Sequence, residues 1–308
     1  MYDLIIIGAG PAGLTAGLYA GRYRIDTLIL EKVCVGGQII LSPTIENFPA
    51  FPAGISSQEL VDRLKEQVDN VGVKIALENV LEILPSFKLK NPIYNVKTGE
   101  KSYETKSVII SSGAQSKRLG IEGEDRLIGH GVSYCATCDG PLFKDKDIVV
   151  IGGGDRAIEE AIFLTSYAKQ VTVIHRRQQL RASKILEEKA RENSKINFIL
   201  DSVVEEIAGV NKVEAVRIKD IKTNAVSNLP CQGIFIYVGI EPNTAFLRNL
   251  LQMNESGFII TDQQMQSSKA GVFACGDCRE KSLYQVISAC SEGAIAADSA
   301  HKYLLTYE

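Results

Sequence analysis

The sequence predicts an α/β fold made of two strand–turn–helix domains, one inserted into the other, with small antiparallel β-meanders. Two apolar strands run directly into glycine-rich turns, and 308 residues suffice for two domains. Turn-forming residues also interrupt apolar strands at 113–120 and at 239–243. We therefore expect three segments: 1–115 and 244–308 form the outer domain, and 116–243 form the inserted one.

The two glycine-rich turns have the same pattern. The strand Asp3–Ile7 leads into Gly8-Ala9-Gly10-Pro11-Ala12-Gly13, and the strand Asp147–Ile151 leads into Gly152-Gly153-Gly154-Asp155-Arg156-Ala157. This is the fingerprint of a Rossmann-like dinucleotide site, in which glycines let the backbone approach a diphosphate at a helix N-terminus. A purely structural glycine turn is the alternative for one copy. Two copies in this context predict two dinucleotide sites.

The residue that ends the next strand distinguishes the two sites. Glu31 lies 23 positions after Gly8, and a carboxylate there suits the hydroxyls of an unphosphorylated ribose. His175 lies 23 positions after Gly152, and further basic residues follow it: Arg176, Arg177 and Arg181. Guanidinium groups bind phosphate, so the second site is expected to prefer NADP(H). The alternative is a solvated basic loop.

The segments around these units have weaker patterns. Ser56 and Glu59 fit a capping box for a helix that ends near Gly72. The stretch 74–110 alternates in places and is expected to form an antiparallel meander. A helix is expected over 182–193, and the small residues of 284–305 suit a helix that packs closely on another surface.

Two of the seven cysteines form the motif Cys135-Ala-Thr-Cys138, which predicts a redox dithiol in this βαβ context. Cys275 and Cys278 have the same spacing, so the two pairs could instead form a four-cysteine zinc site. The pairs lie 137 residues apart, however, which is far beyond the spacing of a zinc ribbon and favours the redox dithiol. The other three are expected to be buried thiols that act as small hydrophobes: Cys34, Cys231 and Cys290.

Charge and hydropathy exclude two classes of partner. The chain has 34 Lys and Arg against 37 Asp and Glu, a net charge of −3, which argues against nucleic acid. No apolar run approaches the roughly 18 residues of a membrane span, and no charged leader with an apolar core precedes the first strand. We therefore expect a cytoplasmic protein.

The order of the motifs resembles bacterial-type, low-molecular-weight thioredoxin reductase, a class II pyridine nucleotide-disulfide oxidoreductase. The segments that carry the resemblance span nearly the whole chain: Gly8–Gly13, Gly36-Gly37-Gln38, Cys135–Gly140, Gly152–Gly154, His175–Arg177 and Phe273–Asp277. The resemblance implies FAD in the discontinuous outer domain and NADPH in the inserted domain. It also implies a homodimer with thioredoxin as the partner.

The resemblance implies roles for individual residues. Cys138 faces the flavin, Cys135 attacks the partner's disulfide, and Asp139 is the acid/base; a helix-terminal Asp139 is the alternative. Asp277 would bind the ribityl chain, and Gln285 would lie near the flavin ring. The remaining FAD-binding residues would be Gly8, Gly10, Pro11, Ala12, Gly13, Glu31, Gly36, Gly37, Gln38, Asn47, Gly113, Gly276 and Val286. The NADPH-binding residues would be Gly152, Gly153, Gly154, Asp155, Arg156, His175, Arg176, Arg177 and Arg181.

Two residues depart from the family pattern. Arg156 stands where a small residue is usual, and it could contact or crowd a phosphate; Tyr284 stands where arginine is common.

Cys275 and Cys278 are expected to be incidental neighbours of the flavin turn, with a second redox pair as the alternative. Two other functions remain open: a reductase for another disulfide protein, and a non-catalytic NADP-sensing flavoprotein.

Overall fold

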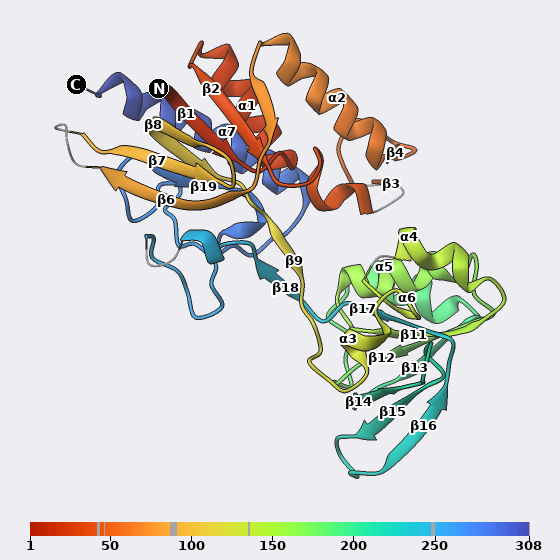
Figure 1. Ribbon diagram of the computed structural model, residues 1–308. Coiled ribbons are helices and arrows are strands. Elements are labelled where there is room, and N and C mark those ends of the chain that lie inside the picture. Colours follow the sequence, from red (N-terminus) through yellow and green to blue (C-terminus); the bar gives the residue numbers. More distant parts are fainter. Residues whose placement is uncertain (42–43, 46, 87–90, 135, 248–249, 308) are drawn as a thin grey trace. The chain divides into compact units, whose positions relative to one another are not determined.

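The computed structural model describes residues 1–41, 44–45, 47–86, 91–134, 136–247 and 250–307. The chain forms two compact units, Met1–Gln115 with Glu241–Glu308, and Ser116–Ile240 (Figure 1). The return to the first unit comes before Glu241 rather than after Asn243. Asn243 belongs to the first unit because its backbone N–H donates to the Gly113 carbonyl oxygen and its side-chain amide to that of Ser112, each at 3.0 Å.

The first unit is built on a seven-stranded sheet of order β5-β2-β1-β8-β7-β6, with β19 also paired to β8. Its strands are β1 (Tyr2–Ile7), β2 (Thr27–Glu31), β5 (Lys74–Leu77), β6 (Val80–Ser86), β7 (Ile93–Thr98), β8 (Ser102–Ile110) and β19 (Val272–Ala274). Strands β6, β7 and β8 form the expected antiparallel meander. The expectation for 74–77 was wrong, because β5 pairs parallel with β2 after the chain crosses over through a helix.

Three helices belong to this sheet: α1 (Pro11–Arg22), α2 (Ser57–Asn70) and α7 (Val286–Leu305). At the start of α2, the Ser56 hydroxyl accepts the Glu59 N–H at 3.1 Å, as expected for an N-cap. Helix α7 packs closely on α1, as its small residues predict. A Cβ added at Gly293 would lie 2.2 Å from the Ala12 carbonyl oxygen, so the two helices approach at backbone distance.

Strand β1 shows why both faces of this sheet are covered. Leu4 and Ile6 are fully buried in the cluster that includes α1 and α7 residues. Ile5 and Ile7 point to the other face, into the cluster that contains Tyr94 of β7. A strand buried on both faces reads as a continuous apolar run, which is why this segment was recognisable from the sequence.

The second unit has a five-stranded parallel sheet of order β10-β17-β11-β12-β13 and an antiparallel sheet β14-β15-β16. The strands are β10 (Val132–Ser133), β11 (Asp147–Ile151), β12 (Gln170–Ile174), β13 (Ile196–Ile199), β14 (Ser202–Ala208), β15 (Ala215–Asp220), β16 (Val226–Pro230) and β17 (Gly233–Ile236). The helices are α3 (Glu124–Leu127), α4 (Ala136–Asp139), α5 (Asp155–Leu164) and α6 (Lys184–Glu192). Helix α6 confirms the helix expected over 182–193.

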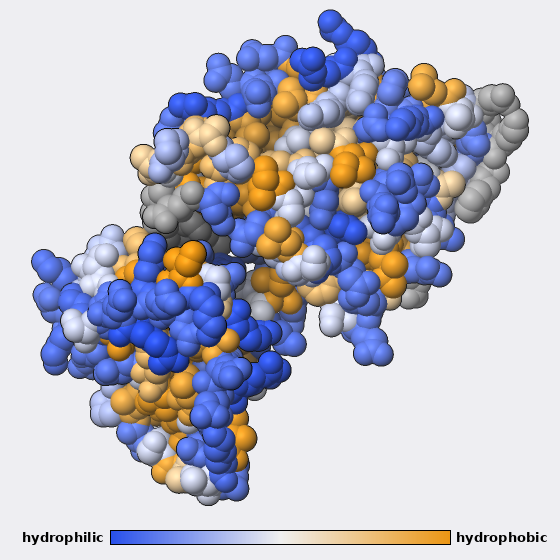
Figure 2. All heavy atoms as spheres, turned by 180° about the vertical axis from the view of Figure 1, so that it is seen from behind, coloured by the Kyte–Doolittle hydropathy of each residue, from blue (hydrophilic) through white to orange (hydrophobic). Residues whose placement is uncertain are grey.

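Short elements complete the fold: β3 (Thr44–Ile45), β4 (Ile55–Ser56), β9 (Ala114–Ser116), β18 (Ile240–Pro242), and 3-10 turns at Gly37–Leu41, Gly140–Phe143, Ala245–Leu247 and Gly276–Cys278. Strands β9 and β18, where the chain passes between the units, pair with each other. Hydrophilic side chains cover most of the face seen in Figure 2, with apolar groups scattered between them. Among the described residues, no helix has the length and apolar character that crossing a bilayer requires.

Candidate functional site: two glycine turns and a dithiol segment

The first glycine turn joins β1 to α1 at the carboxyl edge of the sheet. Gly8 has φ +107°, and a Cβ there would lie 2.3 Å from the Ser111 carbonyl oxygen, so this position requires glycine. A Cβ at Gly13 would lie 1.8 Å from the Gly8 carbonyl oxygen, which explains the close approach of helix and strand. Helix α1 starts after Gly10 without a side-chain cap. Its first amides are therefore available to an anionic group.

Glu31, the last residue of β2, is held beside this turn. Its Oε2 accepts the Ala9 N–H at 2.7 Å, and its Oε1 accepts the Val33 N–H at 3.0 Å. Each carboxylate oxygen keeps a further lone pair, so Glu31 can also accept hydrogen bonds from ribose hydroxyls. The Gly36 N–H donates to the Ala9 carbonyl oxygen at 2.9 Å, which brings the loop 36–38 against the same turn.

Residues from the end of the chain complete this side of the first unit. A Cβ at Gly276 would lie 2.9 Å from the Ala12 Cβ, so the Gly276–Asp277 turn adjoins the first turn of α1. The Asn47 amide donates to Gln285 Oε1 at 3.0 Å, and Gln285 caps α7 just before Val286. A glycine cradle with an uncapped helix start and a ribose-facing carboxylate fits the adenosine diphosphate part of FAD.

The second glycine turn joins β11 to α5 with the same geometry. Gly152 has φ +149°, and a Cβ there would lie 2.4 Å from the Tyr237 carbonyl oxygen. At Gly154, which precedes α5 without a side-chain cap, a Cβ would meet nothing within 4 Å. Asp155 Oδ1 accepts the Ser183 N–H at 2.6 Å and ties the turn to the segment before α6. This open, uncapped helix start fits a second dinucleotide.

His175 differs from the arginines that follow it. Its ring is buried against the second turn, where a Cβ at Gly153 would lie 2.5 Å from Nδ1. Burial, followed by the nearby charge of Arg181, lowers the pKa of His175, so the ring is neutral near pH 7. The sequence predicts a basic group at position 175, but the structure places an uncharged imidazole there. Its Nε2 is buried and has no hydrogen-bond partner among the described residues.

The three arginines are exposed at the end of β12 and beyond it: Arg176, Arg177 and Arg181. The Arg181 backbone N–H donates to the Gly153 carbonyl oxygen at 2.6 Å, which places this residue beside the glycine turn. None of the three guanidinium groups pairs with a carboxylate of the described residues, whereas Arg191 of α6 pairs with Glu187. Unpaired guanidinium groups at this strand end suit a ribose 2′-phosphate.

Arg156 lies in the second turn, and its guanidinium is 5.3 Å from the ring centroid of Tyr237. Glu160, one helical turn further along α5, is a buried carboxyl. Burial raises the pKa of Glu160 to about 7, against the lowering effect of Arg156. Neither Glu160 nor Tyr237 was predicted from the sequence. The signal available for Glu160 was a charged residue beside the apolar positions Ala157 and Ala161 of the same helix.

The dithiol segment lies in the same unit as these residues. Cys135 falls outside the described residues, and Cys138 is described only as part of the backbone of α4. The Ala136 N–H donates to the Tyr237 hydroxyl at 2.9 Å. Asp139 is the last residue of α4, which is the helix-terminal position of the alternative, and its side chain does not cap the 3-10 turn Gly140–Phe143 that follows.

The other cysteines differ in exposure. Cys231 is buried as expected, Cys290 is half-buried, and Cys34 is exposed, so the expectation for Cys34 was wrong. Cys275 and Cys278 are free thiols without solvent exposure. Burial raises the pKa of both, that of Cys278 to about 11, which disfavours the thiolate that disulfide exchange requires.

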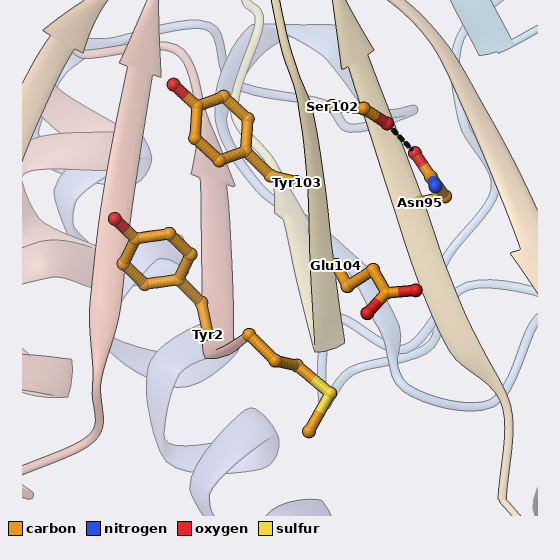
Figure 3. Close-up of a pocket in the computed structure, with 6 residues that line it drawn as sticks. Tyr2, Asn95, Ser102, Tyr103 and Glu104 are labelled. Carbon is orange, nitrogen blue, oxygen red and sulfur yellow. Dashed lines mark hydrogen bonds between the residues drawn. The ribbon is translucent and has the colours of Figure 1, made fainter.

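A shallow pocket lies elsewhere on the first unit (Figure 3). It is lined by Met1, Tyr2, Asn95, Ser102, Tyr103 and Glu104. Figure 3 shows the two tyrosines and Glu104 around it, and Ser102 hydrogen-bonded to Asn95. Because Tyr2 begins β1 and the glycine turn follows its other end, this pocket is at the opposite edge of the sheet from the candidate site.

Comparison with known proteins assigns the chain to a family. The pyridine nucleotide-disulphide oxidoreductase family matches residues 2–293. A thioredoxin reductase of Peptoclostridium litorale is 43% identical over 99% of this chain and 97% of its own. The crystal structure of Lactococcus lactis thioredoxin reductase in its FR conformation is 41% identical, with a TM-score of 0.96 and full coverage of both chains. That of Streptococcus pyogenes is 45% identical, with a TM-score of 0.66 over 100% of this chain and 99% of its own. The chain therefore belongs to the pyridine nucleotide-disulphide oxidoreductase family, and within it to the low-molecular-weight thioredoxin reductases.

Proposed function

We propose that the protein is a flavoprotein disulfide reductase that passes electrons from NADPH through FAD and the Cys135–Cys138 disulfide to thioredoxin. The observation that carries the proposal is the contrast between the two glycine turns. One has the carboxylate of Glu31 beside it, and the other is followed by exposed arginines that pair with no carboxylate of the described residues. Relatives named thioredoxin reductase along the full chain support the same conclusion.

In this proposal the first unit holds FAD and the second holds NADPH. The residues for FAD are those of the first glycine turn, Glu31, the loop 36–38 and Asp277. Those for NADPH are the second turn and the three arginines. Bound flavin would supply the link between hydride transfer from a nicotinamide and electron-pair transfer to sulfur. The uncapped starts of α1 and α5 would bind the two diphosphates.

The dithiol residues then exchange electrons with the partner protein. The Cys135 thiolate attacks one sulfur of the partner's disulfide and forms a mixed disulfide, while the other partner sulfur leaves as a thiolate. The Cys138 thiolate attacks Cys135, which restores the Cys135–Cys138 disulfide and releases the partner as a dithiol. Asp139, when protonated, would supply a proton to the departing thiolate. The family resemblance supports this assignment of the two cysteines.

Redox energetics restrict the partner. Thioredoxin has a potential of about −270 mV, and about 30 mV corresponds to about 1.4 kcal/mol for a two-electron couple. The Cys135–Cys138 couple is therefore expected within roughly 60 mV of that value, since a larger gap makes transfer more than about a hundredfold uphill. Equilibration with glutathione buffers of known potential measures it. A potential far more oxidising would rule out thioredoxin as the substrate.

We also infer that the two units change their arrangement during turnover. The dithiol and the nicotinamide site belong to one unit, and both must reach a flavin held by the other. The family resemblance supports the same inference. A crosslink between the units should stop turnover, and unchanged turnover in the crosslinked protein would contradict this.

The central experiment compares NADPH with NADH as donors for thioredoxin reduction by the purified protein. A flavin spectrum, a preference for NADPH and steady reduction of thioredoxin are expected. Cys135→Ser and Cys138→Ser should each abolish thioredoxin reduction, whereas Cys34→Ser, at an exposed cysteine outside the motif, should keep it. Thioredoxin reduction that survives both serine variants would refute the proposal. Bound NADPH without turnover would instead indicate an NADP-sensing flavoprotein.

Location and assembly are part of the proposal. We infer a cytoplasmic homodimer, because a dithiol that reduces thioredoxin requires a reducing compartment and because the family resemblance implies two copies. Sedimentation analysis of the FAD-loaded protein measures the assembly. A mass of one chain, 33.6 kDa, at micromolar concentration would contradict the homodimer.

A further inference from the structure

Lys281 is a buried lysine beside the Gly276–Asp277 turn. Its side chain is 5% exposed, and its ammonium lies 2.9 Å from Asp277 Oδ1 and 3.5 Å from Glu292 Oε2. Within the described part of the chain, neither Lys281 Nζ nor Asp277 Oδ1 has a hydrogen-bond partner. The two atoms are an ion pair that is out of line for a hydrogen bond. A buried ammonium with three protons left to donate calls for a further acceptor.

The neighbouring charged residues, unlike Lys281, have hydrogen-bond partners within the fold. Glu292 accepts the Gly276 N–H through Oε2 and the Arg279 guanidinium through Oε1, each at 2.8 Å. Arg279 also donates through Nε to the Thr261 hydroxyl at 2.8 Å. Two carboxylates and two cations balance one another in the cluster. Arg279 and Glu292 are each hydrogen-bonded within the fold, whereas the Lys281 ammonium has no hydrogen-bond partner among the described residues.

The position of the ammonium favours the cofactor as the acceptor. The Gly276–Asp277 turn adjoins Ala12 in the first turn of α1, where the proposed site holds a diphosphate. On another side, the Tyr284 ring centroid lies 5.4 Å from Lys281 Nζ, and this ring packs edge-on against Phe258 at 5.8 Å. An aromatic ring attracts a cation but offers no oxygen acceptor of its own in this contact. The ring thus holds Lys281 while leaving its protons free.

We propose that Lys281 is a further FAD-binding residue whose ammonium donates to an oxygen of the cofactor's ribityl–diphosphate chain. The inference rests on the proposed function, because it requires FAD in the first unit. It also gives Tyr284 a role. Arginine is common at position 284 in the family. In this chain the Tyr284 ring instead contacts the ammonium of Lys281, three positions earlier.

The test is a titration of the apoprotein with FAD, in which quenching of the flavin fluorescence measures binding. Lys281→Met keeps an unbranched side chain of nearly the same length and removes the ammonium, and FAD affinity is expected to fall about ten- to hundredfold. The control is Lys302→Met, at a lysine that also pairs with an aspartate, Asp298, at 2.7 Å but is 73% exposed. Its FAD affinity is expected to stay within about twofold of wild type.

A second variant separates ligand binding from charge balance. Lys281→Met combined with Glu292→Gln restores the balance, and the new amide oxygen can still accept the Gly276 N–H; because the amide nitrogen cannot accept from Arg279, Glu292→Gln alone is measured as the reference. If Lys281 only neutralises the carboxylates, the double variant regains wild-type affinity for FAD, and the proposal is overturned. FAD binding that stays weak, with the melting temperature of the apoprotein restored, supports the proposal. Should Lys281→Met fail to fold, the double variant carries the test.

Two further readings make the outcome specific. Loss of affinity for ADP as well as FAD assigns the contact to the diphosphate, and loss for FAD alone assigns it to the ribityl chain. Tyr284→Leu preserves all four charges and should weaken FAD binding several-fold by releasing the ammonium from the ring. Equal FAD affinity of wild type and Lys281→Met overturns this inference only, whereas a wild-type protein that binds no FAD overturns the proposed function itself.

Discussion

The backbone N–H of Ala136 donates to the hydroxyl of Tyr237 at 2.9 Å, and both residues are buried. Ala136 follows Cys135 in the chain, and the Tyr237 ring lies 5.3 Å from the guanidinium of Arg156. One tyrosine therefore contacts both the dithiol segment and the second glycine turn.

Tyr237→Phe removes only the hydroxyl and leaves the Ala136 N–H buried without its acceptor. We expect a loss of about 1–3 kcal/mol in the free energy of unfolding and a several-fold change in thioredoxin turnover. The control is Tyr94→Phe, whose buried hydroxyl donates to the Ala270 carbonyl oxygen in the other unit. It should lose similar stability and keep its turnover. Equal turnover of both variants would show that the Tyr237 hydroxyl does not position the dithiol segment.

Removal of two exposed arginines should change the choice of nucleotide. The double variant Arg176→Ala and Arg177→Ala is expected to raise KM for NADPH about tenfold or more, because guanidinium–phosphate bonds are lost. KM for NADH, which has no 2′-phosphate, should stay within about twofold. Arg191→Ala is the control, since its guanidinium already pairs with Glu187 at 2.9 Å. Parallel increases in both KM values would argue against a 2′-phosphate site.

Glu160 should make stability depend on pH in a direction opposite to most carboxyl groups. Its folded pKa of about 7 exceeds the usual 4.5, so between these values the folded state binds more protons than the unfolded state. The free energy of unfolding should therefore fall as pH rises from about 4.5 to 7, by up to about 3 kcal/mol from this group. Glu160→Gln should remove that part of the slope.

Urea unfolding of wild type and variant at several pH values measures the effect. Subtracting the free energy of unfolding of the variant from that of wild type separates the effect of Glu160 from that of His175. The lowered pKa of His175 acts in the opposite direction at the acidic end of the range. The control is Glu188→Gln, at an exposed glutamate of α6, which should leave the wild-type slope intact. An unchanged slope in Glu160→Gln would mean that this carboxyl titrates normally.

Thiol labelling should follow exposure. In the native protein, iodoacetamide is expected to modify Cys34 and to spare Cys231, Cys275 and Cys278, because burial removes access and raises their pKa. Peptide mass spectrometry reads the modified sites, and labelling in urea gives the full count. A Cys275–Cys278 disulfide found in the native protein would instead support a second redox pair.

Local sequence patterns were sufficient to predict the glycine turns and the acidic residue that follows the first one. The turn after β1 requires glycine at Gly8 and Gly13 because the backbone passes within 1.8–2.3 Å of an added Cβ. Glu31 could be identified because the distance along a βαβ unit is nearly constant. Strand β5 was misassigned, because its pairing partner β2 lies more than forty residues earlier and leaves no signal within 74–77. The exposure of Cys34 had no local signal either.

The sequence by itself determined the two dinucleotide folds, their order, the dithiol motif and the contrast between acidic and basic strand ends, since each depends on residues close together in the chain. Only the tertiary structure decided that His175 is buried and neutral, that Tyr237 accepts the Ala136 N–H, and that Lys281 has protons to spare beside Asp277. Those properties depend on burial and on partners from distant segments, which packing of the whole unit brings together.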